Sequence, residues 1–224
     1  MKKQSIASTL VAALALCGAG AAQAQVAGQV LVKVGWNKIM PKVESGDLGP
    51  PSLPGSKIDI KSDSALFFTG AYMITDNISV EALGGLPYKH TIVGAGAVAG
   101  TGRIGVTHQV SPTVLLQYRF LGAADPLRPY VGAGPTFAKF YNTRGSAALT
   151  SVTNPGGTGT VIGGDTEWGG TIEAGVNYKI DKHWFVDAAL LKVFIKTQAQ
   201  LSTGQEIKAN LNPVAINASI GYAF

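Results

Sequence analysis

Alternation of apolar with small or polar side chains is clearest at the carboxy-terminal end of the chain. From Val214 to Phe224, apolar residues occupy the even positions, and small or polar residues occupy the odd ones. A period of two is the pattern of a β-strand with one apolar face. An outward apolar face and a closing last strand are typical of outer-membrane β-barrels. The ending therefore predicts a transmembrane barrel.

Strand-like stretches recur along the rest of the chain, and their connections are alternately long and short. The connections at 75–77, 122–126 and 180–182 are tight, whereas 39–62, 91–106 and 143–164 are long and rich in small residues. Short periplasmic turns that alternate with long outer loops predict an all-β, eight-stranded antiparallel transmembrane β-barrel, with both termini in the periplasm. The predicted strands are 28–38, 63–74, 78–90, 107–121, 127–142, 165–179, 183–198 and 206–224.

The amino-terminal residues have the pattern of a secretory signal peptide. Lys2 and Lys3 precede an apolar run at 6–16, and Ala22-Gln23-Ala24 has small residues at both ends. This predicts a signal peptide at 1–24 and a single barrel domain at 25–224. The run is too short to span a membrane as a helix. Cys17 follows the bulky Leu16, which disfavours a lipoprotein site, so the mature domain is expected to contain no cysteine.

Composition agrees with a barrel in the outer membrane. Hydrophobic residues make up 46% of the chain and charged residues only 14%, well below the quarter that is usual in soluble domains. Strands with one face in lipid account for both values. The net charge of +5 falls to +3 without Lys2 and Lys3, and no dense basic cluster indicates nucleic-acid binding. The expected partners are outer-membrane lipid and the outer-membrane assembly machinery, and no motif for a cofactor or a metal is recognised.

Several stretches together resemble one family of outer-membrane proteins. They are residues 72–81 followed by Leu86-Pro87-Tyr88-Lys89-His90, then 115–120, 128–134 and the pair Trp184-Phe185. These stretches resemble the OmpW family in the same order over the whole mature chain. The resemblance implies an eight-stranded barrel and passage of small hydrophobic molecules across the outer membrane. The outer loops depart from the family because they are richer in Gly and Ala, which leaves the ligand open.

Charged residues on the predicted inward face indicate a polar network in the lumen. By parity, the inward charges are Lys33, Glu81, Arg119 and Glu173. Glu81 and Arg119 lie near tight turns on neighbouring strands, so we expect them to form a pair near the periplasmic end. Such a network is either a structural plug or a barrier that makes a ligand leave sideways.

Two predicted strands are apolar on both faces, so apolar side chains must also enter the lumen. These are the second strand around 66–73 and the seventh around 184–195. Such side chains either pack the lumen or line a hydrophobic pocket. The candidate pocket residues are Phe67, Met73, Leu190 and Phe194.

A glycine pair and a proline interrupt the third predicted strand. Gly84, Gly85 and Pro87 are poor ladder residues, and a closed barrel has no free edge for a proline. They predict either a lateral opening in the wall or a strand that already projects beyond the membrane. At the end of the chain, Phe224 is the candidate residue for membrane assembly.

Taken together, these residues predict a passive, cofactor-free channel for small hydrophobic molecules, which enter from outside and leave laterally into the membrane. Two other functions stay open. One is a structural or adhesive role carried by the outer loops, and the other is an outer-membrane barrel enzyme. A soluble periplasmic ligand-binding barrel is disfavoured, because it would keep its apolar residues inside.

Overall fold

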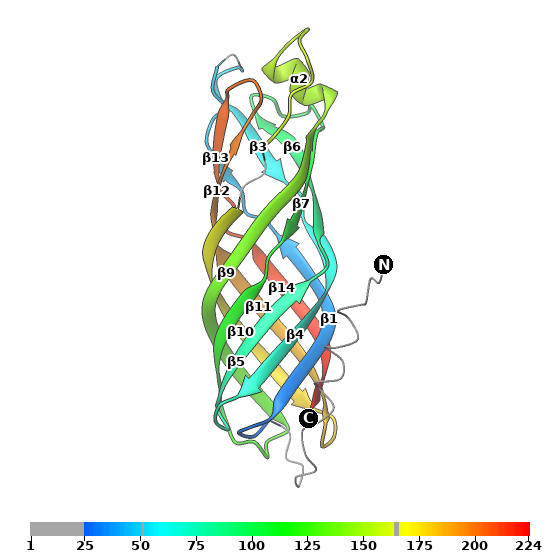
Figure 1. Cartoon of the computed structure of the whole chain (residues 1–224), viewed down its shortest axis with the longest axis vertical. Coiled ribbons are helices and arrows are strands. Elements are labelled where there is room, and N and C mark those ends of the chain that lie inside the picture. The colour runs from blue at the N-terminus through cyan, green and yellow to red at the C-terminus, as the bar shows by residue number, and fades with distance from the viewer. Residues whose placement is uncertain (1–24, 51, 164–165) are drawn as a thin grey trace, which may run out of the picture.

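The computed structural model describes residues 25–50, 52–163 and 166–224. The predicted signal peptide at 1–24 lies outside these residues. Eight strands form a closed antiparallel barrel, in which pairing of β10 with β9 joins the two ends of the sheet (Figure 1). In order around the barrel they are β1 (Val30–Met40), β4 (Asp63–Met73), β5 (Ile78–Gly85), β8 (Thr113–Arg119), β9 (Leu127–Gly145), β10 (Thr166–Lys179), β11 (Trp184–Phe194) and β14 (Val214–Ala223). The predicted fold is confirmed.

One end of the barrel, here called the turn end, carries the short connections 74–77, 120–126 and 180–183 and the carboxy-terminus (Figure 1). Side chains close these turns. Asp181 Oδ1 accepts the backbone N–H groups of Trp184 and His183, each at 2.8 Å. These two bonds favour the charged carboxylate and hold the pKa of Asp181 below its usual range.

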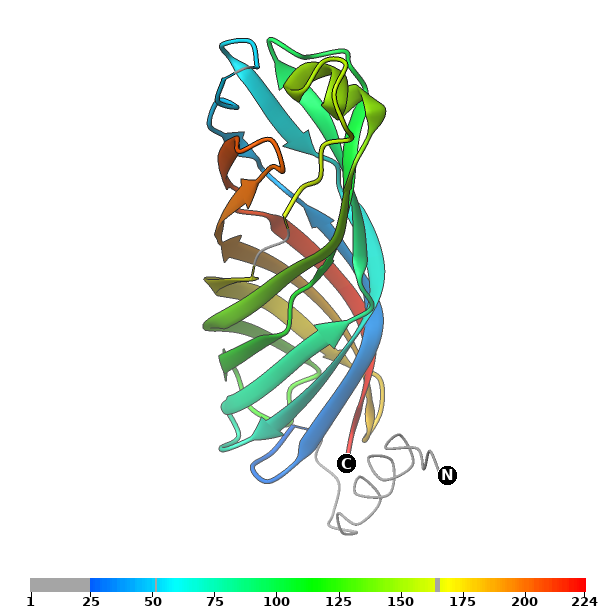
Figure 2. The same cartoon turned by 45° about the horizontal axis from the view of Figure 1, so that its top comes forward.

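The opposite end, here called the loop end, extends well beyond the closed barrel (Figure 2). One wall of the extension consists of β3 (Ser56–Ile60), β6 (Tyr88–Gly96), β7 (Arg103–Val110) and the upper part of β9. The other consists of β2 (Glu44–Ser45), β12 (Lys196–Gln200) and β13 (Glu206–Asn210). The short helix α2 (Ala147–Thr153) packs near the first wall.

The extension corrects two details of the sequence analysis. The predicted strands 78–90, 107–121, 183–198 and 206–224 are each divided into two, and most of the predicted loop 91–106 is strand. Pro87, Pro112 and Pro213 lie at three of the four divisions. Because proline has no backbone N–H, the ladder is interrupted there, and the strand can change partner above the interruption.

The outer surface of the barrel is a continuous apolar band. On β8, Val114, Leu116 and Tyr118 are 47%, 58% and 47% exposed, whereas the alternating Leu115, Gln117 and Arg119 are buried. Aromatic side chains lie at both borders: Tyr72, Phe120, Tyr178 and Trp184 at the turn end, and Phe137, Trp168 and Phe194 at the loop end. Aromatic girdles around an apolar band are the surface of a barrel that spans a bilayer. No helix within the described part of the chain is long and apolar enough to cross a membrane.

The last residue closes the barrel at its turn end. Phe224 N donates to Val30 O at 2.9 Å, and the Phe224 ring packs edge-on against Tyr222 at 4.8 Å between centroids. Phe224 is therefore part of the turn-end girdle and also joins the first strand to the last.

Replacing Phe224 with Asp is expected to impair membrane assembly, because a charge would replace an interfacial aromatic ring. Heat-modifiable migration of the outer-membrane fraction on denaturing gels measures the folded amount. Phe224→Tyr, which keeps the ring, is the matched control and should assemble normally. Equal folded amounts of the Asp variant and the parent would reject the role assigned to Phe224.

Candidate functional site

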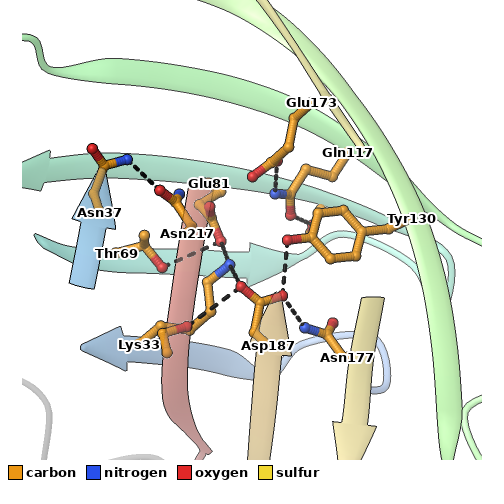
Figure 3. A network of polar contacts seen from close by, with 12 residues as sticks. Lys33, Asn37, Thr69, Glu81, Gln117, Tyr130, Glu173, Asn177, Asp187 and Asn217 are labelled. Carbon is orange, nitrogen blue, oxygen red and sulfur yellow. Dashed lines mark hydrogen bonds and ion pairs between the residues drawn. The ribbon is translucent and has the colours of Figure 1, made fainter. Parts of the chain in front are cut away.

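A buried ion-pair cluster occupies the lumen in the half nearer the turn end (Figure 3). Lys33 Nζ on β1 lies 2.8 Å from Glu81 Oε2 on β5 and 3.3 Å from Asp187 Oδ1 on β11. The three residues are between 0% and 4% exposed. Buried charges are tolerated only when they are paired and hydrogen-bonded. Here one ammonium group joins two carboxylates from different strands.

Neutral groups complete the shell around these carboxylates. Asp187 Oδ2 accepts the Tyr130 hydroxyl at 2.8 Å and the Asn177 amide at 2.6 Å, and Thr69 Oγ1 donates to Glu81 Oε2 at 3.2 Å. The Tyr130 ring lies across Gly175, where an added Cβ would approach ring atoms to 2.5 Å. Glycine at position 175 thus makes room for the ring that positions Asp187.

Arg119 does not pair with Glu81, so the predicted ion pair is wrong. Arg119 Nη1 donates to Ser79 Oγ, and its guanidinium lies 5.4 Å from the Tyr130 ring centroid. No carboxylate of the described residues lies within 4 Å of Arg119. The register explains this, because β5 and β8 pair Ser79 with Gln117 and place Arg119 closer to the turn than Glu81.

The polar network continues around and above this cluster. Ser79 Oγ donates to Gln117 Oε1 at 3.1 Å, and Gln117 Nε2 donates to Glu173 Oε2 at 2.8 Å. Higher in the lumen, Asn37 donates to Asn217, and the Tyr88 hydroxyl donates to Asn37 Oδ1 at 2.7 Å. We call the whole network the polar plug. Each of the eight strands contributes a side chain to it: Lys33, Thr69, Glu81, Gln117, Tyr130, Glu173, Asp187 and Asn217.

Above the polar plug, most residues that line the lumen are apolar, with threonine, serine and glutamine side chains among them. A cavity between the two walls of the extension has Ile58, Ile60 and Ile92 on one side and Ile207, Ala209 and Leu211 on the other. We call it the upper cavity. A second cavity, the lower cavity, lies next to Tyr88 and Asn37 and is lined by Leu83, Leu191, Val193, Ile195 and Ala215. Ile195 and Ala138 of the lower cavity belong to the same buried cluster as Ile60, Ile92 and Leu211 of the upper one. The apolar lining is therefore continuous between the two.

The barrel ladder is interrupted beside the lower cavity. Pairing of β5 with β8 ends at Leu83 and Thr113, and pairing of β6 with β7 resumes only at Tyr88 and Gln109. Gly84 and Gly85 stay paired with β4, and Leu86 N still donates to Leu66 O at 2.9 Å. An added Cβ at Gly85 would approach Leu66 O to 2.8 Å, so glycine is required there. Only the ladder toward β8 and β7 is broken.

Both strands that border this ladder gap carry a proline, Pro87 on one and Pro112 on the other. Gly85, Leu86 and Ser111 line the lower cavity at the gap, and Leu86 is 53% exposed on the outer surface. A single residue, Leu86, thus borders both the cavity and the outer surface. The ladder gap therefore lies between the lower cavity and the outer surface.

Comparison with known proteins agrees with this architecture. The family model described as the OmpW family matches residues 26–224. The chain belongs to the OmpW family. It is 32% identical to outer membrane protein W of Escherichia coli (strain K12), covering 100% of each chain. It is 31% identical to the dibenzothiophene metabolism operon protein PahQ of Pseudomonas aeruginosa, over 77% of each. The crystal structure of OprG from Pseudomonas aeruginosa has a TM-score of 0.80 at 24% identity, covering 91% of this chain and 99% of that one, and shows the shared fold.

Membership of the OmpW family places this barrel in the outer membrane, since full-length relatives are named outer membrane proteins. The names of these relatives carry no enzyme activity. The sequence predicted four charged residues that face the lumen. All four are buried there: Lys33, Glu81, Arg119 and Glu173.

The predicted pocket residues need a correction. Leu190 and Phe194 are 56% and 50% exposed, so they face lipid and not the lumen. Phe67 and Met73 point inward, but neither lines the two cavities, and Met73 packs with Leu31 and Phe185 near the turn end. In this OmpW-family barrel, the residues of β11 and its carboxy-terminal neighbour that line the lower cavity are Leu191, Val193 and Ile195.

Asp187 is a residue of the polar plug that was not predicted from the sequence. It shares the parity of Phe185 and Leu191, and a buried carboxylate needs a partner that only the lumen supplies. The parity of Asp187 is the signal in the sequence that shows which of the two apolar faces of β11 turns inward. Tyr130 was missed because a tyrosine on an alternating strand fits a girdle equally well.

Proposed function

We propose that this OmpW-family barrel is a passive conduit for small hydrophobic molecules. Its loop end faces outside, and its termini lie in the periplasm. A solute enters between the two walls of the extension and resides in the upper and lower cavities. It then leaves sideways through the ladder gap into the membrane. The protein supplies a path and no chemistry, and it requires no cofactor.

The observation that carries this proposal is the position of the ladder gap between the apolar lining and the polar plug. An apolar molecule that reaches the lower cavity meets charged and amide groups below it, where it would displace hydrogen bonds without replacing them. Beside it, Gly85, Leu86 and Ser111 line the cavity at the ladder gap, and Leu86 is exposed on the outer surface. Lateral exit is therefore the less costly direction.

Passage requires side chains to move. The lower cavity has a volume of about 50 Å³, smaller than the roughly 150 Å³ cavity that is known to bind benzene. Leu86 is held by no ladder bond on the side of β7 and β8, so its displacement opens the cavity toward lipid. The name of the relative PahQ refers to dibenzothiophene metabolism, and this aromatic compound is a suitable probe.

The test measures dibenzothiophene uptake by cells with and without the protein, together with a double variant that closes the gap. Continuing the register of Ala82 with Val114 would place Leu86 opposite Val110. Leu86→Cys/Val110→Cys, cross-linked with a short bifunctional thiol reagent that contains a reducible disulfide, should lower uptake to the level of cells without the protein. Reduction of the same sample should restore it, because no other cysteine is present from Gln25 onward.

Each outcome separates one alternative from the proposal. Full uptake by the cross-linked protein would reject lateral exit. Equal uptake by all strains would reject the conduit and favour a structural or adhesive role for the loops at 39–62 and 143–164. Conversion of the probe to a product by the purified barrel would identify an enzyme. Cross-linking of each single-cysteine variant serves as the control for modification of the surface.

A further inference from the structure

A groove on the outer surface of the extension is lined by basic side chains. It lies over the outward faces of β6, β7 and β9, above the apolar band, and we call it the basic groove. Four of its lining residues carry positive charge or an imidazole and two carry neutral polar groups: Lys89, Arg103, Arg144, His108, Asn142 and Ser146. No acidic residue lines it.

The strand register explains why these side chains converge. Lys89 on β6 lies directly opposite His108 on β7, and Val106 on β7 lies opposite Arg144 on β9. Between these two pairs the β7–β9 ladder shifts register, and Asn142 has a φ of 50°. An extra residue of this kind bends and twists its strand. The irregularity therefore directs Arg144 toward the same outer face as Lys89.

The charges in the basic groove are not neutralised by the protein. Among the described residues, no carboxylate lies within 4 Å of the charged atoms of Lys89, Arg103 or Arg144. Asp63, the acidic residue in contact with this region, accepts the backbone N–H of Lys89 at 2.7 Å. By contrast, the exposed Lys61 pairs with Asp59 at 2.9 Å. The basic groove thus has free charge for an anion.

The position of the basic groove along the barrel axis, relative to the membrane border, indicates which kind of molecule carries the anion. Three lysines follow an aromatic residue by two positions on the same face: Lys38 after the exposed Trp36, Lys139 after the partly exposed Phe137, and Lys196 after the exposed Phe194. Lys89 follows Leu86 at the same border. Such a belt lies where a bilayer changes from acyl chains to headgroups. The basic groove begins at this belt and continues away from the membrane.

We propose that the basic groove binds the phosphate groups of a phosphorylated glycolipid in the outer leaflet, whose acyl chains lie on the apolar band below. Arginine matches phosphate with a planar set of donors, and lysine supplies a compact charge beside it. The aromatic pair of His108 and Tyr141, 5.7 Å between centroids, borders the groove at headgroup height. The inference rests on the proposed orientation of the loop end, but not on solute passage.

Binding is measured by native mass spectrometry of the detergent-solubilised barrel, titrated with diphosphoryl lipid A. The groove variant is Lys89→Gln/Arg103→Gln/Arg144→Gln. The matched control, Lys57→Gln/Lys182→Gln/Lys208→Gln, removes the same charge from exposed positions outside the groove. The groove variant should bind at least about tenfold more weakly than the parent, because each basic residue at a membrane surface contributes to anionic lipid binding. The control should stay within about twofold of the parent.

Two further probes identify the ligand chemistry. Dephosphorylated lipid A should bind the parent and the groove variant equally weakly, and glucose 1,6-bisphosphate should bind at least about tenfold more weakly than the lipid. Unchanged binding by the groove variant would overturn the proposal, as would equal affinity for the two lipids. Equal affinity for the soluble sugar phosphate would reject a lipid ligand. If the triple variant does not fold, Lys89→Gln and Arg144→Gln made separately must each weaken binding. Dibenzothiophene uptake by the groove variant is measured in parallel, so that loss of lipid binding is separated from loss of passage.

Discussion

Replacing Lys33 with methionine is expected to lower the free energy of unfolding of the barrel by about 3–5 kcal/mol, the usual cost of removing one partner from a buried ion pair. The Lys33 ammonium is the shared partner of Glu81 and Asp187, and all three residues are buried. Without it, two carboxylates would remain in a lumen that water does not reach. Methionine is similar in length to lysine, so the expected loss of stability reflects the removed charge more than the removed volume.

The midpoint of guanidinium-induced unfolding in detergent micelles, followed by tryptophan fluorescence, measures this effect. Lys38→Met on the same strand is the matched control. Its side chain is exposed, and the expected change is below about 0.5 kcal/mol. If Lys33→Met shifts the unfolding midpoint no more than Lys38→Met does, the polar plug does not stabilise the barrel.

Double-mutant cycles then distinguish the ion pair of the structure from the one predicted by the sequence. Lys33→Met and Glu81→Gln should be strongly non-additive, because their charged atoms lie 2.8 Å apart. Glu81→Gln and Arg119→Met should be closer to additive, since Arg119 contacts Ser79 and Tyr130 and no carboxylate within the described residues. The opposite order of coupling would show that the register of β5 and β8 is wrong.

Placing a charge in the apolar lining is expected to have the largest effect on transport. Ile195 is 3% exposed, lines the lower cavity and belongs to the apolar cluster of the upper one. Ile195→Glu should lower dibenzothiophene uptake at least about tenfold, because an apolar solute would have to desolvate the carboxylate while passing. Uptake is compared at equal amounts of folded protein in the outer membrane.

Ile195→Ala is the control at the same position. It removes apolar volume without adding charge, so uptake should be maintained. Equal uptake by the Glu and Ala variants would mean that solutes do not pass Ile195. The substitutions Leu190→Glu and Phe194→Glu test membrane insertion and not passage, because both side chains face lipid. Those substitutions should reduce membrane insertion and leave passage through the surviving folded barrels unchanged.

How far the sequence predicts this protein depends on whether a feature belongs to one strand or to several. Alternation is visible within a single strand, so Lys33, Glu81, Arg119 and Glu173 were correctly assigned to the inward face. The ladder interruption at Gly84, Gly85 and Pro87 was also expected, since glycine and proline weaken a strand wherever they occur.

The phase of the seventh strand could not be decided from its apolar residues alone. Leu190 and Leu191 are equally apolar, and only the buried Asp187 shows which face turns inward. Sequence therefore determined the fold class, the number of strands in the closed barrel and most of their faces. It also showed that charges enter the lumen.

Only the tertiary structure decided which charges meet. Glu81 contacts Lys33 and not Arg119, and Pro87 and Pro112 border the same ladder gap, because the register of each ladder sets which residues share a level. The basic groove depends on the same information, since its residues come from three strands and one irregular register. Alternation is a local property of a chain, whereas register depends on all eight strands closing together around one lumen.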